Sequence, residues 1–239
     1  MEFIPSGESA VFCSFGNSID ETISESIIDL HLALRASGIK GYIESVPSYT
    51  GLMVYFNNAS TTLAEIRGKI SGHLHKLQEN LHRNEKTVIY VPVSYGGAYG
   101  PDLEYIAKEK GLPEEEFIRI HSEKPYRIYM LGFTPGFPYL GGMDKRIAFP
   151  RKETPVLKIK AGSVGIAGDQ TGIYPLESPG GWQIIGKTPL SLFDFSQKEP
   201  FLFRAGSYIK FEAVSLDEYF NIAEDLRSGH YSVRKEILE

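Results

Sequence analysis

Apolar residues in the first 84 positions follow strand-like and helix-like patterns in turn. The runs 9–15, 41–46 and 51–56 predict three strands, the last two joined by a turn-rich segment. Elsewhere apolar residues recur at helical spacing, first at Ile19, Ile23, Ile27, Leu30 and Leu34, and then at Leu63, Ile66, Ile70, Leu74, Leu77 and Leu81. The predicted order is therefore β-α-β-β-α.

Local signals place the starts of the two helices. Ser18 followed by Glu21 predicts a capping box for the first helix, and Thr62 with Glu65 predicts one for the second. If residues 88–91 add a fourth strand, the order resembles the split β-α-β pattern of a small ferredoxin-like sandwich.

The polar stretch 81–86 is the expected boundary between two domains, 1–84 and 85–239, because little in it demands burial. Beyond it, Pro101 and Pro113 predict the starts of two helices. Strand-like runs then alternate with turns, at 126–131, 156–159, 164–167, 182–185 and 208–213. This spacing favours a barrel or a sandwich. We expect a last helix at 215–226 to close the chain, with an inner face of Leu216, Tyr219, Phe220, Ala223 and Leu226.

Composition narrows the class of protein. The 239 residues are 42% hydrophobic and carry a net charge of −5, which suits a buried core but gives no general attraction to nucleic acid or anionic lipid. Cys13 is the single cysteine and lies in an apolar run, so we expect a buried structural thiol and a reducing compartment. The sequence shows neither a secretory signal nor a long apolar run, and we expect a cytoplasmic protein without a membrane span.

Residues 131–194 hold 11 of the 24 glycines, and we expect the functional surface there because glycine permits tight turns and close approach of the backbone to a ligand. The polar side chains of this block can bind a carboxylate or an amide: Asp144, Arg146, Arg151, Lys158, Lys160, Asp169, Gln170, Thr171, Tyr174, Ser178, Gln183 and Lys187. His121 stands just before the strand that leads into the block, where a general acid or base would be useful.

Two other motifs are interpreted as structural. Residues 181–188 satisfy the Walker A spelling, but Pro189 follows Thr188 directly and residues 182–185 predict a strand, so we reject a P-loop. The predicted helix pair at 101–120 carries an acidic run where a DNA-reading helix needs donors, so we expect it to pack on the barrel.

Histidines and a serine give no further site. His73, His75 and His82 do not converge at metal-ligand spacing, so we expect solvent-facing side chains and no metal. Ser163 lacks the spacing of a nucleophile elbow, and we expect it in a turn.

Four long strings carry a family resemblance: YMLGFTPGFPYLGG at 129–142, AGSVGIAG at 161–168, QTGIYP at 170–175, and SPGGW at 178–182 through Thr188-Pro189. They resemble the family of 5-oxoprolinase B subunits, which includes a sporulation kinase inhibitor and proteins called allophanate hydrolase subunit 1, and which matches part of the carboxyltransferase region of urea carboxylases. The resemblance covers nearly the whole chain and is strongest from 126 to 195. Val156 and Lys160 stand where the family often has arginine and proline, so substrate contacts at these positions do not carry over.

The resemblance implies an α+β protein with a ferredoxin-like domain (1–84) and a cyclophilin-like β-barrel (85–239). It implies work beside partners like the C and A subunits of 5-oxoprolinase, in a complex that uses ATP to cleave the lactam 5-oxoproline to glutamate. We expect this chain to contribute one wall of the site and to be inactive alone. The candidate catalytic residues are His121, Asp169 and Gln170. The candidate substrate-binding residues are Arg146, Arg151, Lys158, Gly141, Gly142, Thr171, Tyr174 and Gln183.

Two alternative functions stay open. One is a protein that inhibits a histidine kinase by docking on it, as the sporulation inhibitor does. The other is a component of an allophanate or urea amidohydrolase or carboxylase system. The sequence alone separates these poorly from the oxoprolinase.

Overall fold

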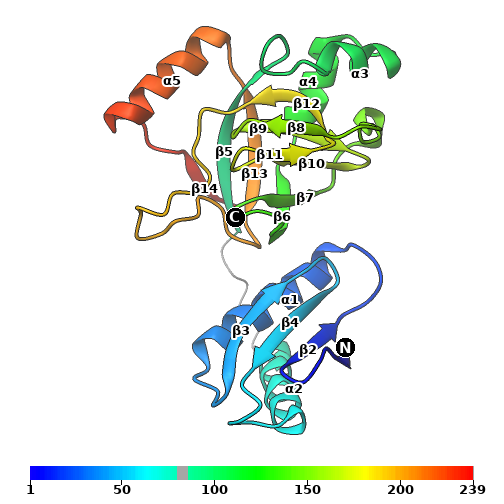
Figure 1. Ribbon diagram of the computed structural model, residues 1–239, viewed down its shortest axis with the longest axis vertical. Helices are drawn as coiled ribbons and strands as arrows, with labels where there is room; N and C mark the ends of the chain where they lie inside the picture. The colour runs from blue at the N-terminus through cyan, green and yellow to red at the C-terminus, as the bar shows by residue number, and fades with distance from the viewer. Residues whose placement is uncertain (80–85, 239) are drawn as a thin grey trace. The chain divides into compact units, whose positions relative to one another are not determined.

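The structure is a computed structural model that describes residues 1–79 and 86–238 (Figure 1). The chain divides into two compact units, Met1–Glu85 and Lys86–Glu239. The expected boundary at 81–86, with Leu81 and His82, lies outside the described residues except for Lys86. In the described part of the chain, no helix combines the length and the apolar composition needed to cross a membrane.

The first unit is a four-stranded antiparallel sheet with two helices. Its elements are β1 (Glu2–Pro5), β2 (Ala10–Ser14), α1 (Glu21–Ala36), β3 (Tyr42–Pro47), β4 (Gly51–Phe56) and α2 (Leu63–Glu79). The strands are ordered β1-β2-β4-β3, so β2 and β3 run parallel with β4 between them. The predicted β-α-β-β-α order is confirmed.

The expected fourth strand at 88–91 is wrong for this unit. Those residues belong to β5 (Lys86–Tyr95), which pairs with strands of the second unit. The place beside β2 is taken instead by β1, which the sequence did not predict because it is short and contains a proline.

The two helix starts differ in how well they were predicted. Ser18 does not cap α1, because the Asp20 carboxylate accepts hydrogen bonds from the backbone N–H groups of Thr22 and Ile23 at 2.9 and 3.1 Å. The α2 capping box is confirmed, with Thr62 N donating to Glu65 Oε2 at 2.7 Å and Glu65 N donating to Thr62 Oγ1 at 3.3 Å.

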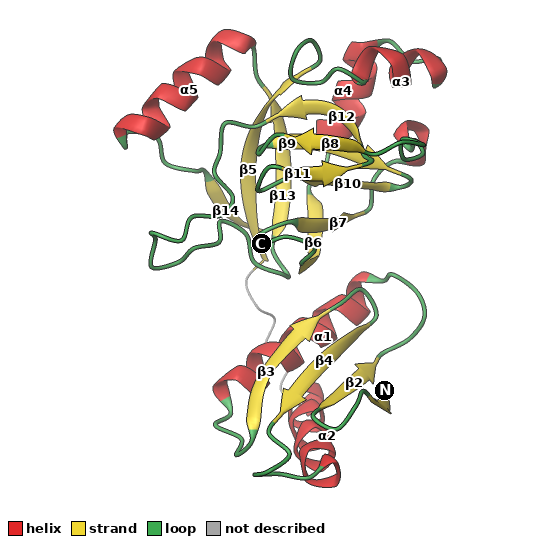
Figure 2. Cartoon of the chain, in the orientation of Figure 1, coloured by secondary structure: helices red, strands yellow, loops and turns green. Residues whose placement is uncertain are grey.

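Both helices cover one face of the sheet (Figure 2), where their apolar stripes pack on β4. The core includes Ile27, Leu30, Leu34, Leu52, Val54, Phe56, Ile66 and Ile70. Ile19 precedes α1 and is exposed, so its predicted place on the inner face is wrong. Cys13 is fully buried and its burial raises the thiol pKa to about 12, which confirms the structural thiol.

The second unit is a nearly closed β-barrel, as the strand spacing predicted. Its strands are β5, β6 (Tyr126–Leu131), β7 (Pro138–Gly141), β9 (Ser163–Ala167), β10 (Gln170–Ile173), β12 (Gln183–Lys187), β13 (Tyr208–Ala213) and β14 (Lys235–Leu238). The order is β10-β9-β12-β5-β13-β6-β7, with β14 on the other half of β5. The outer strands β10 and β7 contact each other. A Cβ atom built at Gly172 of β10 would lie 3.2 Å from the carbonyl oxygen of Pro138 in β7. A separate two-stranded sheet joins β8 (Val156–Ile159) and β11 (Ser178–Gly180).

Helices lie outside the barrel strands (Figure 2). The short helices α3 (Leu103–Glu109) and α4 (Glu114–Ser122) bury Leu103, Ile106, Phe117 and Ile120 in the barrel core, which confirms their predicted packing on the barrel. Helix α3 starts two residues after Pro101, whereas α4 starts directly after Pro113 as predicted.

The last helix, α5 (Leu216–Ser228), does not close the chain, because β14 follows it and pairs with β5. Its predicted inner face is confirmed only in part. Tyr219 is buried, but Leu216 and Phe220 are more than half exposed.

Candidate functional site

The loop between β6 and β7 holds an unusual backbone conformation. Phe133 has φ +64°, and it is the one non-glycine residue with positive φ in the described chain. A conformation of this kind costs roughly 1–2 kcal/mol and is held here by turn hydrogen bonds from Gly132 N to Phe137 O (3.1 Å) and from Phe137 N to Thr134 O (3.1 Å). The Phe133 ring is 67% exposed, so the strain presents an aromatic side chain to solvent.

This loop forms an open hollow of about 360 Å³, lined by residues 131–136 and Phe201, which we call the loop hollow. The Thr134 hydroxyl oxygen is buried and has no hydrogen-bond partner. Leaving a buried hydroxyl unpaired costs about 1–3 kcal/mol. A hydroxyl kept without a partner at the wall of a hollow can bind a ligand or a second polypeptide.

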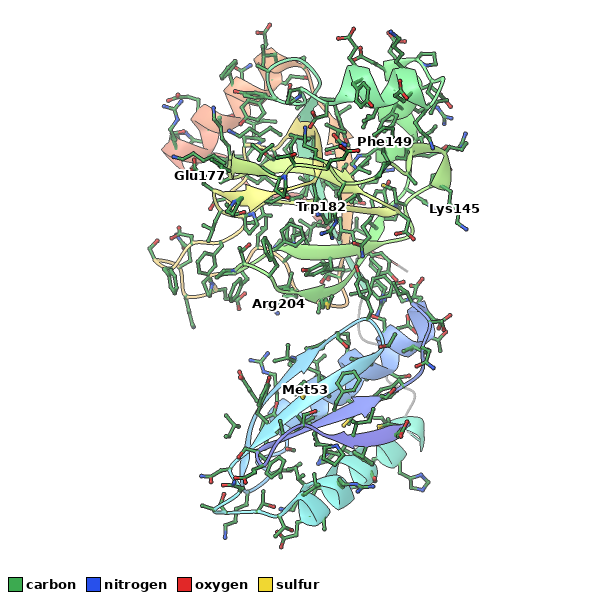
Figure 3. All side chains as sticks on the ribbon, turned by 45° about the vertical axis from the view of Figure 1, so that its right-hand side comes forward. Met53, Lys145, Phe149, Glu177, Trp182 and Arg204 are labelled. Atoms are coloured by element: carbon green, nitrogen blue, oxygen red, sulfur yellow. The ribbon has the colours of Figure 1, made fainter. Side chains whose placement is uncertain are left out.

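Aromatic rings connect the loop to the far side of the barrel sheet. Phe137 contacts Phe133, Tyr139, Tyr174 and Trp182, with ring centroids 5.9, 5.1, 5.5 and 5.5 Å away. Trp182, labelled in Figure 3, directly precedes β12. Phe133, which lines the loop hollow, is therefore connected through Phe137 to a cluster that includes the predicted residue Tyr174.

Arg151 lies at this cluster with its guanidinium 6.0 Å from the Trp182 ring centroid. It is exposed, and none of the described carboxylates forms an ion pair with it. Burial raises the pKa of Tyr174 to about 12, with the backbone N–H of Trp182 and the Arg151 charge acting in the opposite direction. The same charge acts on Tyr139, so the guanidinium lies near both phenol groups.

The residues flanking Arg151 are fixed. Gln183 Nε2 donates to the Pro150 carbonyl at 3.1 Å, and Lys152 N donates to Gly181 O at 2.7 Å. The Lys152 ammonium pairs with Asp102, whose other oxygen accepts from Ile184 N at 2.6 Å. The backbone on both sides of Arg151 is therefore fixed, while its guanidinium stays exposed beside Trp182. A guanidinium can bind a planar carboxylate with two parallel hydrogen bonds.

His121 has a different environment from the one expected of an acid–base group. It is fully buried, with Nδ1 2.8 Å from the Tyr95 hydroxyl and Nε2 2.8 Å from Thr171 Oγ1. Because Thr171 donates its own proton to Gly165 O (3.0 Å), the network assigns a proton to Nε2 and leaves Nδ1 to accept from Tyr95. Burial lowers the pKa of His121 to about 3. The imidazole is neutral and out of reach of substrate, so the structure favours a structural role for His121 and Thr171.

The remaining predicted residues do not gather at one place. Arg146 pairs with Asp144 at 2.8 Å and Lys158 with Glu177 at 3.4 Å. Lys145, next to Arg146, and Glu177 project from opposite sides of the barrel (Figure 3). Asp169 is exposed in the turn between β9 and β10, and Gln170 is half-buried at the start of β10.

Several glycines of the block serve packing, contrary to the expectation of a purely ligand-facing surface. A Cβ at Gly141 would lie 2.4 Å from the Tyr129 ring, and one at Gly186 would lie 2.7 Å from Val93. Gly142 is exposed in a turn at φ +84°. Ser163, expected in a turn, is the first residue of β9.

The rejection of the Walker motif is confirmed. Lys187 ends β12, and Thr188 and Pro189 lead into a loop, so no helix follows to hold phosphates. Within residues 1–79 and 86–238, no three His, Cys, Asp or Glu side chains are grouped in a way that would hold a metal ion.

Sequence reasoning missed Phe133, Thr134 and Tyr139 as site residues. All three lie in the string 129–142, so the motif pointed to the correct segment. The motif could not show that the Thr134 hydroxyl lacks a hydrogen-bond partner, because pairing depends on neighbours that only the fold brings together.

The chain is similar in sequence to several known proteins. The family model "Carboxyltransferase domain, subdomain C and D" matches residues 1–203. The chain is 42% identical over 229 residues to the 5-oxoprolinase B subunit of Bacillus subtilis, covering 92% of this chain and 95% of that protein. A putative urea carboxylase of Emericella nidulans is 25% identical over 151 residues, and this chain spans 12% of its length.

The crystal structure of TTHA0988 superposes with a TM-score of 0.77 at 32% identity. The match covers 86% of this chain and 40% of that one, so the chain spans well under half of the longer protein. The match to the family model and the long alignment to the Bacillus subtilis protein lead to the same conclusion: the chain belongs to the carboxyltransferase subdomain C and D family, together with the 5-oxoprolinase B subunits.

Proposed function

We propose that this chain is a subunit of an ATP-dependent 5-oxoprolinase that hydrolyses 5-oxo-L-proline to L-glutamate. The observation that carries the proposal is the 42% identity to a 5-oxoprolinase B subunit over 92% of the chain. The chain is inactive alone in this proposal, and its partners are proteins like the C and A subunits of that enzyme.

The reaction explains the need for ATP and several polypeptides. Hydrolysis of an unstrained five-membered lactam is uphill at neutral pH, so it must be coupled to a favourable reaction. In one route, ATP transfers its γ-phosphoryl group to the amide oxygen and water adds to the ring carbon. The C–N bond then breaks as the nitrogen takes up a proton, which leaves an acyl phosphate, and a second water hydrolyses this to glutamate and phosphate. Such a site must anchor the carboxylate, stabilise developing negative charge and exclude water.

This chain offers an anchor and one wall of that site. Arg151 is exposed, held in place on both sides, and free of a carboxylate partner, which suits the carboxylate of 5-oxoproline. The Thr134 hydroxyl is available for a hydrogen bond. Of the other candidates, Tyr174 and Gln183 support the cluster around Arg151. No ATP site is assigned to this chain.

An exposed aromatic surface beside the loop hollow suits a partner protein. A Cβ at Gly136 would lie 3.3 Å from Phe193 Cβ and 3.6 Å from Phe201 Cδ1, so the loop packs on the 193–201 segment. Phe193 makes an edge-to-face contact with Phe195, which is 86% exposed, and Phe201 is 40% exposed. Grouped exposed aromatics are typical of protein interfaces. In this proposal, a companion polypeptide covers them and closes the loop hollow.

We propose the finer fold assignment as well, a ferredoxin-like domain at 1–84 and a cyclophilin-like barrel at 85–239. The parallel pair β2 and β3 with β4 between them supports the first, with β1 in the place of the usual last strand.

The test is reconstitution. The chain is purified alone and with the proteins encoded beside it, and ATP-dependent release of glutamate from 5-oxoproline is measured. We expect activity only in the complete complex. Glutamate release by the chain alone would contradict the proposal. Its absence in every combination of proteins that contains the chain would contradict the proposal as well.

A urea-processing role is a second candidate, favoured by the match to a putative urea carboxylase. It predicts ATP- and bicarbonate-dependent consumption of urea by the reconstituted complex. Urea turnover without 5-oxoproline turnover would replace the first proposal by this one.

A further inference from the structure

A second hollow of about 260 Å³ lies where the turn before β9 meets the end of β12. We call it the lysine hollow. Its lining consists of Ala161, Gly162, Pro175, Lys187, Thr188, Pro189, Leu190, Ser191 and Tyr219. None of these residues takes part in the loop hollow or in the Arg151 cluster.

Lys187 is half-buried at this hollow and has no neutralising partner. Its ammonium lies 5.4 Å from the Tyr99 ring centroid, a cation–π contact. Burial, and then the positive charge of Lys160, lower the pKa of Lys187. No carboxylate among the described residues acts on it, whereas nearby Lys158 has Glu177 at 3.4 Å.

A partly buried ammonium without an acid nearby is stabilised when an anion binds beside it. Hydroxyl groups complete the lining. The Thr188 hydroxyl accepts from Leu190 N at 3.3 Å and keeps its own proton to donate. Tyr219 is buried and contacts Tyr99 with a centroid distance of 4.6 Å, which fixes the apolar side of the hollow.

The position of Lys187 is set by the backbone. Gly162 has φ +82°, and a Cβ there would lie 2.4 Å from the Thr188 carbonyl oxygen. Thr188 N donates to Gly162 O at 2.9 Å. The turn and the strand end are therefore locked together, and the aliphatic part of Lys187 lies 3.5 Å from that same Cβ position.

We propose that the lysine hollow binds the oxyanion group, carboxylate or phosphate, of a small molecule at Lys187, with the Thr188 hydroxyl as an additional donor. The inference rests on the hollow, on Lys187 without an acidic partner and on the fixed turn. It does not depend on the proposed oxoprolinase activity, and it concerns a site distinct from Arg151.

Calorimetric titration of the full chain with 5-oxo-L-proline, inorganic phosphate and ATP, each in a separate experiment, tests the proposal. We expect saturable binding of at least one probe at one site per chain. Binding of 5-oxoproline alone identifies a carboxylate ligand, and binding of phosphate or ATP identifies a phosphate ligand. Absence of saturable binding by all three probes overturns the proposal.

Variants locate the site. K187M is expected to weaken binding at least tenfold, whereas K160M should change it little, because Lys160 is exposed and does not line the hollow. K187R keeps the charge and should retain most of the binding. K158M is the matched control, since Lys158 has its own acidic partner and should bind like the wild type. Equal affinity of K187M and wild type contradicts the proposal.

A direct measurement covers the case in which K187M does not fold. Reductive methylation places a ¹³C label on lysine amines, and the Lys187 signal, assigned with K187R, should shift when the bound probe is added. A shift confined to other lysines overturns the assignment of the site.

Discussion

The network around His121 and the site around Thr134 and Arg151 belong to the same barrel but differ in how their polar groups are paired. In the network, both imidazole nitrogens, the Thr171 hydroxyl and the Tyr95 hydroxyl all have partners within 3.0 Å. In the loop that lines the loop hollow, the Thr134 hydroxyl has none, and at Trp182 the Arg151 guanidinium faces solvent without a carboxylate.

The difference separates structural from functional use of polar residues. A fully paired buried network stabilises one core arrangement and leaves nothing for a ligand. A buried hydroxyl without a partner costs free energy in the isolated chain, and binding can recover it, while an exposed guanidinium stays available for an anionic ligand. His121 was the attractive catalytic candidate in the sequence, and its complete pairing makes it the weaker one in the structure.

The largest expected effect is at His121. Replacement by leucine removes two hydrogen bonds, which leaves the Tyr95 hydroxyl without its imidazole partner and Thr171 with only its bond to Gly165 O. We expect His121→Leu to lower the free energy of unfolding by about 3 kcal/mol in urea denaturation. A loss below about 0.5 kcal/mol would show that the hydrogen-bond network of His121 does not stabilise the fold, and would contradict the structural role given to it.

The same residue should make stability depend on pH. Its pKa is lowered to about 3 in the folded chain against 6.5 when unfolded, so the unfolded chain binds more protons between these values. Stability is therefore fully present above pH about 6.5 and falls as pH falls toward 3. Between pH 7 and 5 we expect a loss of about 2 kcal/mol from this group. H121Q should lose less over the same range, and an equal loss would contradict the assignment.

Arg151 should affect activity more than stability. In the reconstituted complex, we expect Arg151→Ala to reduce kcat/KM for 5-oxoproline about tenfold, or about 1.4 kcal/mol, mainly through a higher KM. R151K should recover part of the loss because it retains the charge without the bidentate geometry. Lys158→Ala, at an exposed ion pair elsewhere on the barrel, is the control. Unchanged kinetics in R151A would remove Arg151 from the site.

The smallest expected effect is at Thr134. Replacement of threonine by valine should change the free energy of unfolding in opposite directions at Thr134 and at Thr171. Thr134→Val removes an unpaired hydroxyl and should raise the free energy of unfolding by about 1 kcal/mol while lowering the activity of the complex. Thr171→Val removes a paired hydroxyl and should lower stability. Thermal unfolding of both variants measures the signs. A destabilised Thr134→Val would mean that its hydroxyl is already satisfied.

Much of the fold followed from the sequence. Alternating and helical periodicity predicted the β-α-β-β-α order and the barrel strands, because these patterns reflect which side chains are buried. Errors fell at places without such a pattern. Strands β1, β7, β10 and β14 were not predicted, because none of them alternates apolar and polar residues. The start of α1 was decided by Asp20, a better-placed acceptor than Ser18.

The sequence by itself determined the segment that matters, since the string 129–142 contains most of the loop hollow, and it supplied Arg151 and Tyr174 among many polar candidates. Only the tertiary structure decided which of those candidates have partners. It buried His121 beside Thr171, 50 residues away, and paired Arg146 and Lys158 with acids, while leaving Thr134, Arg151 and Lys187 unsatisfied. Pairing depends on distances between residues remote in sequence, and the fold sets those distances.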